Sequence, residues 1–213
     1  MEDIVPSAFA PSPDGPHLRP DLAALIGSRI CHDLNNPLGA IGNGLELMEL
    51  AGHKAGPEVA LIAQSVAAAK ARLQFLRIAF GAASPQQRMN GSEVAGIVAA
   101  HYGPGRLEID WPVLAELGRD EARRAFLALM CLETALPFGG QIAVQPGPAA
   151  WRFEAEAARL RALDELWGVA AGVVAPDDIG APLVQFALLP GAAAQAGRRV
   201  RVQTGEGGIA LEV

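Results

Sequence analysis

One histidine stands on the polar side of a strongly apolar segment. Residues 28–48 read SRICHDLNNPLGAIGNGLELM and contain His32. At about 100° per residue, apolar side chains recur every three or four residues along one helical stripe: Leu22, Ile26, Ile30, Leu34, Leu38, Ile41, Leu45 and Met48. His32 is two residues from both Ile30 and Leu34, so it points away from this stripe. An exposed imidazole has a lone pair and titrates near neutrality, so it can act as a nucleophile.

The residues within a turn or two of His32 are polar or very small: Ser28, Arg29, Asn35, Asn36, Gly39 and Asn43. Three glycines, Gly39, Gly42 and Gly44, fall inside the same helical pattern, where each costs about 1 kcal/mol relative to alanine. We expect these small residues to keep a surface flat enough for a partner helix, with Ala40 and Ile41 adding apolar contact. Close packing against a neighbouring helix is the alternative.

The elements that position His32 form a predicted helical hairpin. The first helix runs from a cap at Asp21 to about Leu50, and Pro37 should bend it just after the histidine. After a short connection at 52–57, residues 57–80 carry a heptad seam: Val59, Ile62, Val66, Ala69, Leu73, Leu76 and Phe80. A hairpin cannot cover both stripes, so we predict a homodimer that closes a four-helix bundle with two copies of His32 outside. Packing against the rest of the same chain is the competing solution.

The remaining chain predicts an α+β fold with four segments. Residues 1–20 are rich in proline and predict a flexible tail, 21–83 form the hairpin, 84–89 are a linker, and 90–213 form an α/β domain. In that domain the patterns favour helices at 90–100, 120–136, 160–171 and 178–189, with Pro190 ending or kinking the last. The first of these opens with a polar cap at Asn90, and the second has its apolar side at Phe126, Leu129, Met130 and Leu132. They favour strands at 107–111, 141–145, 151–156, 199–204 and 209–213, the last two joined by a hairpin turn.

Composition excludes several classes of function. The chain has 213 residues, of which 51% are hydrophobic, enough for a real core. Its net charge of -6 argues against nucleic acid as a direct partner. We find no apolar run of about 18 residues and no signal pattern, and therefore expect a cytoplasmic protein without a membrane partner. Cys31 and Cys131 lack the spacing of a disulfide or zinc site.

The run CHDLNNPLGAIGNGLEL resembles the dimerisation and histidine-phosphotransfer segment of sensor histidine kinases, whose pattern is His, acidic residue, Leu, two variable residues, Pro, Leu. It is more closely similar to the ChpT-type histidine phosphotransferases of alphaproteobacteria. The resemblance implies a hairpin followed by an α/β sandwich like the ATP-binding domain of histidine kinases.

That resemblance also raises the question of ATP. Against the kinase pattern, Cys131 stands where an asparagine would hold magnesium, and Thr134 where a lysine often stands. Magnesium prefers oxygen ligands, so a cysteine is a poor substitute. Asp177, Asp178 and Gly180 are present, but no Asp-x-Gly-x-Gly follows. The three glycines Gly205, Gly207 and Gly208 fit a tight turn better than a phosphate loop. We therefore expect no ATP and no cofactor on this chain, with Mg²⁺ supplied by a partner receiver domain.

The resemblance implies that a phosphoryl group moves from the aspartate of one receiver domain to His32 and then to a second receiver, through a phosphohistidine and without autokinase activity. The partners implied are the receiver of a hybrid histidine kinase and the receivers of response regulators. By the same resemblance, Asp33 orients the His32 ring, and Asn36 either supports hydrolysis or only fits the partner surface. Arg29 is either a residue that attracts phosphate charge or an ordinary surface cation. His17, His53 and His101 are expected to be ordinary loop residues. A divergent ATP-dependent kinase and a non-catalytic pseudokinase that binds receivers remain alternatives.

Overall fold

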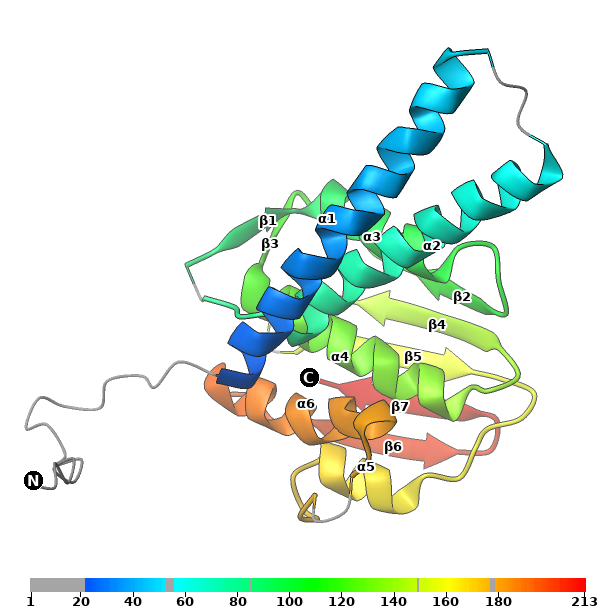
Figure 1. The fold of residues 1–213 in the computed structure, drawn as a ribbon. Coiled ribbons are helices and arrows are strands. Elements are labelled where there is room, and N and C mark those ends of the chain that lie inside the picture. Colours follow the sequence, from blue (N-terminus) through cyan, green and yellow to red (C-terminus); the bar gives the residue numbers. More distant parts are fainter. Residues whose placement is uncertain (1–21, 53–55, 85, 149, 177–178) are drawn as a thin grey trace, which may run out of the picture.

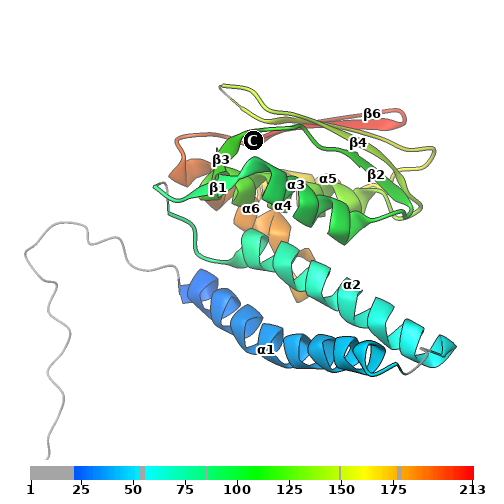
Figure 2. The same ribbon diagram turned by 90° about the horizontal axis from the view of Figure 1, so that it is seen from above.

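The computed structural model describes residues 22–52, 56–84, 86–148, 150–176 and 179–213. Its elements form three stacked layers: a helical hairpin, a middle layer of helices, and a sheet (Figure 2). The mixture of helices and sheet confirms the predicted α+β class. The expectations for residues 1–20, Asp21, His17, His53, Asp177 and Asp178 lie outside the described residues.

The hairpin consists of α1 (Leu22–Leu50) and α2 (Pro57–Phe80), as the periodicity predicts. α1 stays helical through Pro37. Proline occupies the first turn of α2, where its missing N–H costs nothing, and the Gly81 N–H donates to the carbonyl of Arg77 at the other end. The two helices pack side by side and project beyond the rest of the molecule (Figure 1).

The sheet is mixed, with the order β2-β4-β5-β7-β6. Its strands are β2 (Leu107–Asp110), β4 (Gly140–Gln145), β5 (Arg152–Glu156), β6 (Arg201–Gly205) and β7 (Gly208–Glu212). β2 and β4 are parallel, and the other neighbours are antiparallel. β6 and β7 meet at Gly205 opposite Gly208, and Gly207 in the turn has φ of 80°. The glycine-rich segment is thus the tight turn that the sequence predicts.

The helices of the C-terminal half cover one face of this sheet (Figure 2). They are α3 (Gly91–Tyr102), α4 (Arg119–Ala135), α5 (Asp164–Ala170), the 3-10 turn η1 (Ala181–Leu183) and α6 (Val184–Gln195). Asn90 caps α3 by accepting hydrogen bonds from the N–H groups of Ser92 and Glu93, which confirms the predicted polar cap.

Four details of the sequence-based prediction are wrong. A two-stranded ribbon pairs β1 (Arg88–Asn90) with β3 (Glu116–Gly118), although three residues are too few for a visible alternating pattern. The segment 160–171 is helical only at α5. α6 begins later than predicted and continues through Pro190, because Ala192 and Ala193 beyond it pack in the core.

α4 is the centre of the core. Its predicted apolar side was Phe126, Leu129, Met130 and Leu132, yet the helix is buried on nearly every side because it lies between the sheet, α2 and α6. Phe126 stacks on Phe75 of α2 with ring centroids 4.4 Å apart. The hairpin is therefore joined to the C-terminal layers through an aromatic contact.

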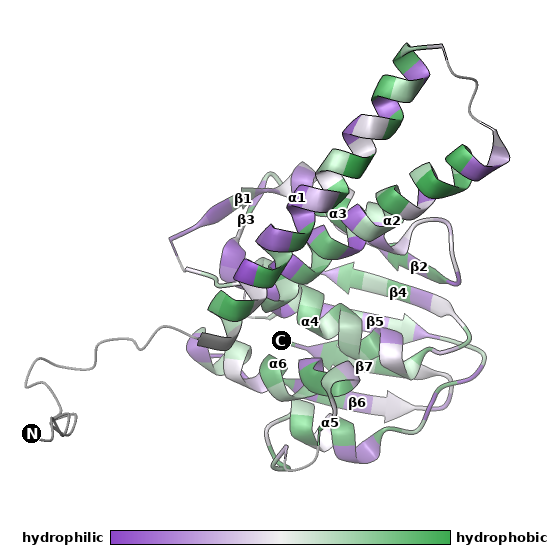
Figure 3. Cartoon of the chain, viewed as in Figure 1, coloured by the Kyte–Doolittle hydropathy of each residue, from purple (hydrophilic) through white to green (hydrophobic). Residues whose placement is uncertain are grey.

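The apolar stripe of α1 is not covered within one chain. Five of its members are between 43% and 60% exposed: Ile26, Ile30, Leu34, Ile41 and Met48. On α2, Leu61 and Ile62 are also exposed, whereas Phe75, Ile78 and Ala79 near its other end enter the core. Exposed hydrophobic residues thus occur along the length of α1 and in the first half of α2 (Figure 3).

By length and composition alone, α2 could cross a membrane, which the search for apolar runs in the sequence missed. It is the one such helix in the described part of the chain. The second half of α2 packs against α3 and α4, and Lys70 and Arg72 interrupt its apolar character. The core thus accounts for the apolar residues at the end of α2, whereas Leu61 and Ile62 near its start are exposed.

Candidate functional site

His32 lies on the outer surface of α1 with a side chain that is 72% exposed. Its Nδ1 lies 3.2 Å from Oδ1 of Asp33. The other oxygen of the same carboxylate, Oδ2, accepts a hydrogen bond of 2.7 Å from Nε of Arg29, one turn earlier on the helix. Helical spacing thus places Arg29, Asp33 and His32 in one short chain of polar contacts.

The carboxylate of Asp33 is held in its ionised form. The hydrogen bond from Arg29, followed by the one from His32, lowers the pKa of Asp33 below its usual range. Because an ionised carboxylate can only accept a hydrogen bond, the contact with Asp33 favours the neutral tautomer of His32 that carries its proton on Nδ1 and has its lone pair on Nε2. The ring therefore presents a nucleophilic nitrogen on its far side from Asp33.

The other residues predicted to meet a partner share this surface. Asn35, Asn36, Ala40 and Asn43 are exposed on α1. A Cβ atom added at Gly39 would meet nothing within 4 Å. Packing within the chain therefore does not require glycine at this position.

Ser28 has a structural contact as well. Its hydroxyl accepts a hydrogen bond of 3.2 Å from the N–H of Ala82, just beyond the end of α2. Gly42 also faces α2, since an added Cβ would run into the amine of Lys70. Of Gly39, Gly42 and Gly44, Gly42 is thus the one that fits the packing explanation.

A pocket of about 270 Å³ adjoins His32, in the groove between α1 and α2. Its lining residues are Ser28, Cys31, His32 and Asn35 from α1 with Leu73, Gln74 and Arg77 from α2. The sequence reasoning missed Gln74 and Arg77. An antiparallel register that sets the start of α1 beside the end of α2 would have pointed to them.

Cys31 forms part of the wall of this pocket. Burial raises the pKa of its thiol, while the charge of Arg77 acts in the opposite direction. Cys31 is 7% exposed, so it supplies an apolar wall rather than a reactive group.

Arg119 connects the end of α2 to the C-terminal layers. Its guanidinium donates from Nη1 to the carbonyl of Ile78 at 2.8 Å and from Nη2 to that of Arg77 at 2.7 Å. Desolvation, followed by the neighbouring charges of Arg123 and Arg77, lowers its pKa to about 10. Arg119 therefore stays charged at neutral pH and satisfies the free carbonyls of the last turn of α2.

Of the two residues compared with the kinase pattern, Cys131 lies in the core and Thr134 is half-buried. Cys131 is fully buried, and burial raises the pKa of its thiol. The hydroxyl of Thr134 donates to the carbonyl of Met130 at 2.9 Å and accepts a bond of 3.1 Å from the side chain of Gln185. α6, which carries Gln185, packs directly on α4. In the described part of the chain, no three His, Cys, Asp or Glu residues are grouped as metal ligands.

The expectation for His101 is corrected. It lies in the last turn of α3 rather than in a loop, and its ring stacks on Phe75 with centroids 4.1 Å apart. Desolvation, followed by the charge of Arg72, lowers its pKa to about 4. His101 is therefore a neutral packing residue between α2 and α3.

Comparisons with known proteins agree with this geometry. Residues 91–208 match the family model described as the histidine phosphotransferase C-terminal domain. The protein phosphotransferase ChpT of Brucella abortus (strain 2308) is 39% identical over 127 residues, which cover 59% of this chain and 60% of that protein. The match thus spans less than two thirds of the relative's length.

A solved structure described as a bacterial phosphotransferase superposes with a TM-score of 0.63 at 27% identity. The superposition covers 90% of this chain and 95% of the other, so it includes the hairpin as well as the C-terminal layers. Together with the match over residues 91–208, these likenesses confirm the resemblance read from the His32 segment. The chain belongs to the ChpT-type histidine phosphotransferases.

Proposed function

We propose that His32 takes a phosphoryl group from the phosphoaspartate of one receiver domain and passes it to the aspartate of another. The observation that carries this proposal is the exposed imidazole whose Nδ1 contacts Asp33. Transfer of this kind depends on an unhindered nucleophile that is correctly oriented and on neutralisation of phosphoryl charge.

The chemistry balances within this site. Nε2 of His32 attacks phosphorus, the N–P bond forms, and the P–O bond to the donor aspartate breaks, which releases that aspartate as a carboxylate. The proton on Nδ1 stays in place, and the positive charge that develops on the ring is stabilised by the ionised Asp33. Attack by the second receiver's aspartate reverses these events and restores the neutral imidazole.

Asn36 lies four residues after His32 on the same helix and is exposed. It is placed for one of two roles, positioning a water that hydrolyses a phosphoryl group or contacting the receiver surface. Asn36→Ala distinguishes them, because loss of a water-positioning amide slows dephosphorylation without slowing transfer, whereas loss of a docking contact slows transfer.

The proposal does not use ATP. Two observations support a reaction without ATP: Cys131 is buried, and the hydroxyl of Thr134 is paired with Gln185. Cys131 and Thr134 stand at the positions where the kinase pattern has its magnesium and phosphate ligands. Mg²⁺ for the reaction comes from the receiver domain. The proposal places the protein in the cytoplasm, together with the receiver domains.

The proposal includes a homodimer formed through the hairpins. The exposed stripe of α1, Ile26, Ile30, Leu34, Ile41 and Met48, supplies the apolar surface for a four-helix bundle. Size-exclusion chromatography with light scattering should give twice the chain mass at micromolar concentration, and Ile30→Glu should halve it. A strict monomer for the unchanged chain would contradict this part.

The test of the function uses a panel of purified receiver domains, each phosphorylated on its aspartate. Label should reach the unchanged protein from at least one receiver and should not reach His32→Gln. Labelling of His32 from radioactive ATP alone would indicate a kinase instead. Binding of receivers without any transfer to His32 would indicate a pseudokinase.

A further inference from the structure

We infer that Arg77 of α2 binds the phosphoryl group while it resides on His32, and so provides the positive charge for transfer from the opposite wall of the groove. This inference rests on the proposed function. It replaces Arg29, the arginine that the sequence favours, with one that the sequence does not single out.

The first support is the location of Arg77. It lines the same pocket as His32, about 270 Å³ in volume, and it does so from the facing helix. A phosphoryl group on Nε2 of His32 extends away from Asp33, which contacts the ring through Nδ1. A cation across the groove can therefore reach phosphoryl oxygens that a residue behind the ring cannot.

The second support is the difference in partners between the two arginines. Nε of Arg29 is 2.7 Å from Asp33, so its charge is already compensated. No carboxylate of the described residues forms an ion pair with the side chain of Arg77, which is exposed. In a chain with a net charge of -6, an uncompensated guanidinium beside the nucleophile is a selective position for an anion.

The third support is the extra positive charge nearby. Arg77 also lines a second pocket of about 400 Å³ together with Arg88 and Arg119. Arg88 lies 3.7 Å from Glu116, and Glu93 lies on the same wall, so part of this charge is balanced. The charges of Arg77 and Arg119 still repel each other, and a phosphoryl anion would relieve that repulsion.

The backbone at Arg77 is also held in place. Its carbonyl accepts hydrogen bonds from Nη2 of Arg119 at 2.7 Å and from the N–H of Gly81 at 3.1 Å. Because Arg119 belongs to α4, the C-terminal layers fix the helical turn that carries Arg77. This gives those layers a role in the site although they contain none of the reacting atoms.

A guanidinium suits this task because its N–H groups form a planar fork that can donate two parallel bonds to phosphoryl oxygens. It remains charged throughout, so it exchanges no proton with the phosphoryl group. It stabilises the charge while the N–P bond forms and the bond to the donor breaks.

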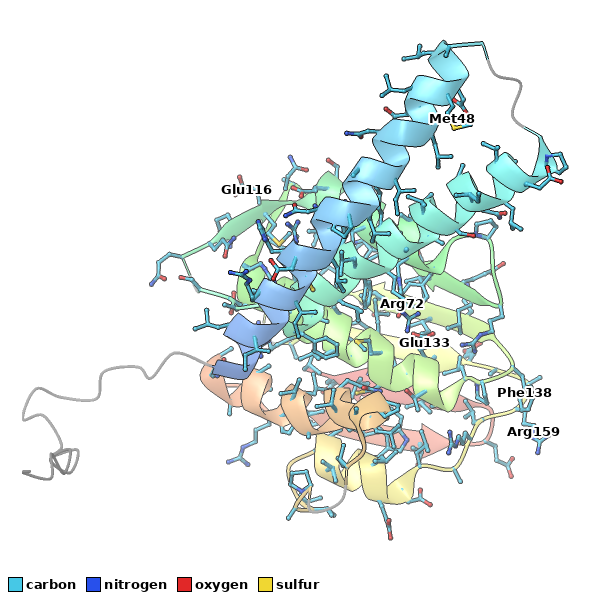
Figure 4. The ribbon with its side chains drawn as sticks, in the orientation of Figure 1. Met48, Arg72, Glu116, Glu133, Phe138 and Arg159 are labelled. Atoms are coloured by element: carbon cyan, nitrogen blue, oxygen red, sulfur yellow. The ribbon has the colours of Figure 1, made fainter. Side chains whose placement is uncertain are left out.

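The test uses phosphoramidate, a small donor that transfers its phosphoryl group to histidine and needs no receiver. The proteins are the unchanged chain, Arg77→Ala, Arg77→Lys and the control Arg72→Ala. Arg72 is exposed on the same helix, but it does not line the His32 pocket. Figure 4 shows Arg72 near Glu133 of α4. Labelling of His32 is followed by intact-protein mass spectrometry and by phosphorus NMR.

We expect Arg77→Ala to slow labelling about tenfold, Arg77→Lys to recover part of the rate, and Arg72→Ala to change nothing. We also expect the phosphohistidine signal to titrate at higher pH in Arg77→Ala, because a neighbouring cation favours the dianion. A merely structural role would not move this titration.

The outcomes separate the two proposals. If the unchanged protein is labelled at His32 and Arg77→Ala matches it in both rate and titration, the inference about Arg77 is wrong and the phosphotransfer function stands. If His32 of the unchanged protein accepts no phosphoryl group from phosphoramidate or from any receiver, both are wrong.

Discussion

The hairpin and the C-terminal layers both contain helices with apolar faces, but they differ in what covers those faces. In α4, Phe126, Leu127 and Leu129 are completely buried by the sheet and by other helices. In α1, Ile30 and Leu34 are about half exposed, and the polar face beside them carries His32. The C-terminal layers thus complete their own core, whereas the hairpin presents both an apolar stripe and a reactive face.

This difference separates stability from function within one chain. α2 belongs to both regions, because its second half enters the core through Phe75 and Ile78 while Gln74 and Arg77 line the His32 pocket. A substitution in the core should therefore lower the stability of the whole fold. A substitution on the hairpin surface should instead change how the protein binds its partners. The three predictions below test this division, from the largest expected change in the free energy of unfolding to the smallest.

Phe126→Ala should lower the free energy of unfolding by about 3–5 kcal/mol, because it removes a fully buried ring and its stack on Phe75. Leu34→Ala should cost less than about 1 kcal/mol at dilutions where the chain is monomeric, since Leu34 is 50% exposed. Urea unfolding measures both.

At higher protein concentration the cost of Leu34→Ala should rise, because a dimer would bury this residue. Phe126→Leu is the control for the core, and should cost distinctly less than Phe126→Ala. Equal costs for Phe126→Ala and Leu34→Ala at all concentrations would remove the distinction between the two regions.

His101 should make the contact between the regions sensitive to acid. Its pKa is about 4 in the folded protein against an ordinary value of 6.5, so the unfolded chain takes up the proton first as the pH falls. The stabilisation is fully present above pH 6.5 and is lost as the pH falls from 6.5 toward 4. The free energy of unfolding should drop by about 2 kcal/mol between pH 7 and pH 5 from this residue alone.

His101→Phe keeps an aromatic ring beside Phe75 and removes the titration. Comparing the unchanged protein with this variant in urea at both pH values isolates the contribution of His101 from that of the carboxylates. An identical pH dependence in the two proteins would contradict the buried, neutral state of the imidazole.

Gly39→Ala should stabilise the protein by about 0.5–1 kcal/mol, because an added Cβ has open space and alanine favours a helix. Gly42→Ala should raise the free energy of unfolding by less, because the added Cβ would run into the amine of Lys70, which must then move. Thermal unfolding at one protein concentration compares the two.

Gly39→Leu then tests the functional side of the same position. A stable dimer that no longer accepts phosphate from a receiver would support docking on this surface. Loss of the dimer would instead assign Gly39 to packing between two chains.

Much of the fold could be predicted because its signals are local. Apolar periodicity defined α1 and α2, and the polar cap at Asn90 and the Gly205–Gly208 turn marked the limits of their elements. The β1–β3 ribbon could not be predicted, because three residues carry no pattern and its strands are 26 residues apart at their nearest ends. The helix through Pro190 was missed because core packing outweighs the local cost of proline.

The candidate site likewise has a part that local spacing predicts and a part that depends on tertiary contact. His32, Asp33 and Arg29 lie within five residues of each other on one helix, so their spacing alone brought them together. Arg77 is 45 residues from His32 and enters the pocket only through the register of the hairpin. The capping of α2 by Arg119 also depends on tertiary contact, over separations of 41 and 42 residues, and no local pattern in the sequence predicts it.

The most direct test of the account follows one labelled phosphoryl group through the protein. A phosphorylated donor receiver is mixed with the unchanged chain and with an unlabelled acceptor receiver, and samples are stopped over a time course without ATP. The account predicts that label appears first on His32 and then passes to the acceptor. With His32→Gln, label should reach neither the protein nor the acceptor. Label that reaches the acceptor at the same rate with His32→Gln, or that reaches His32 only when ATP is added, would contradict it.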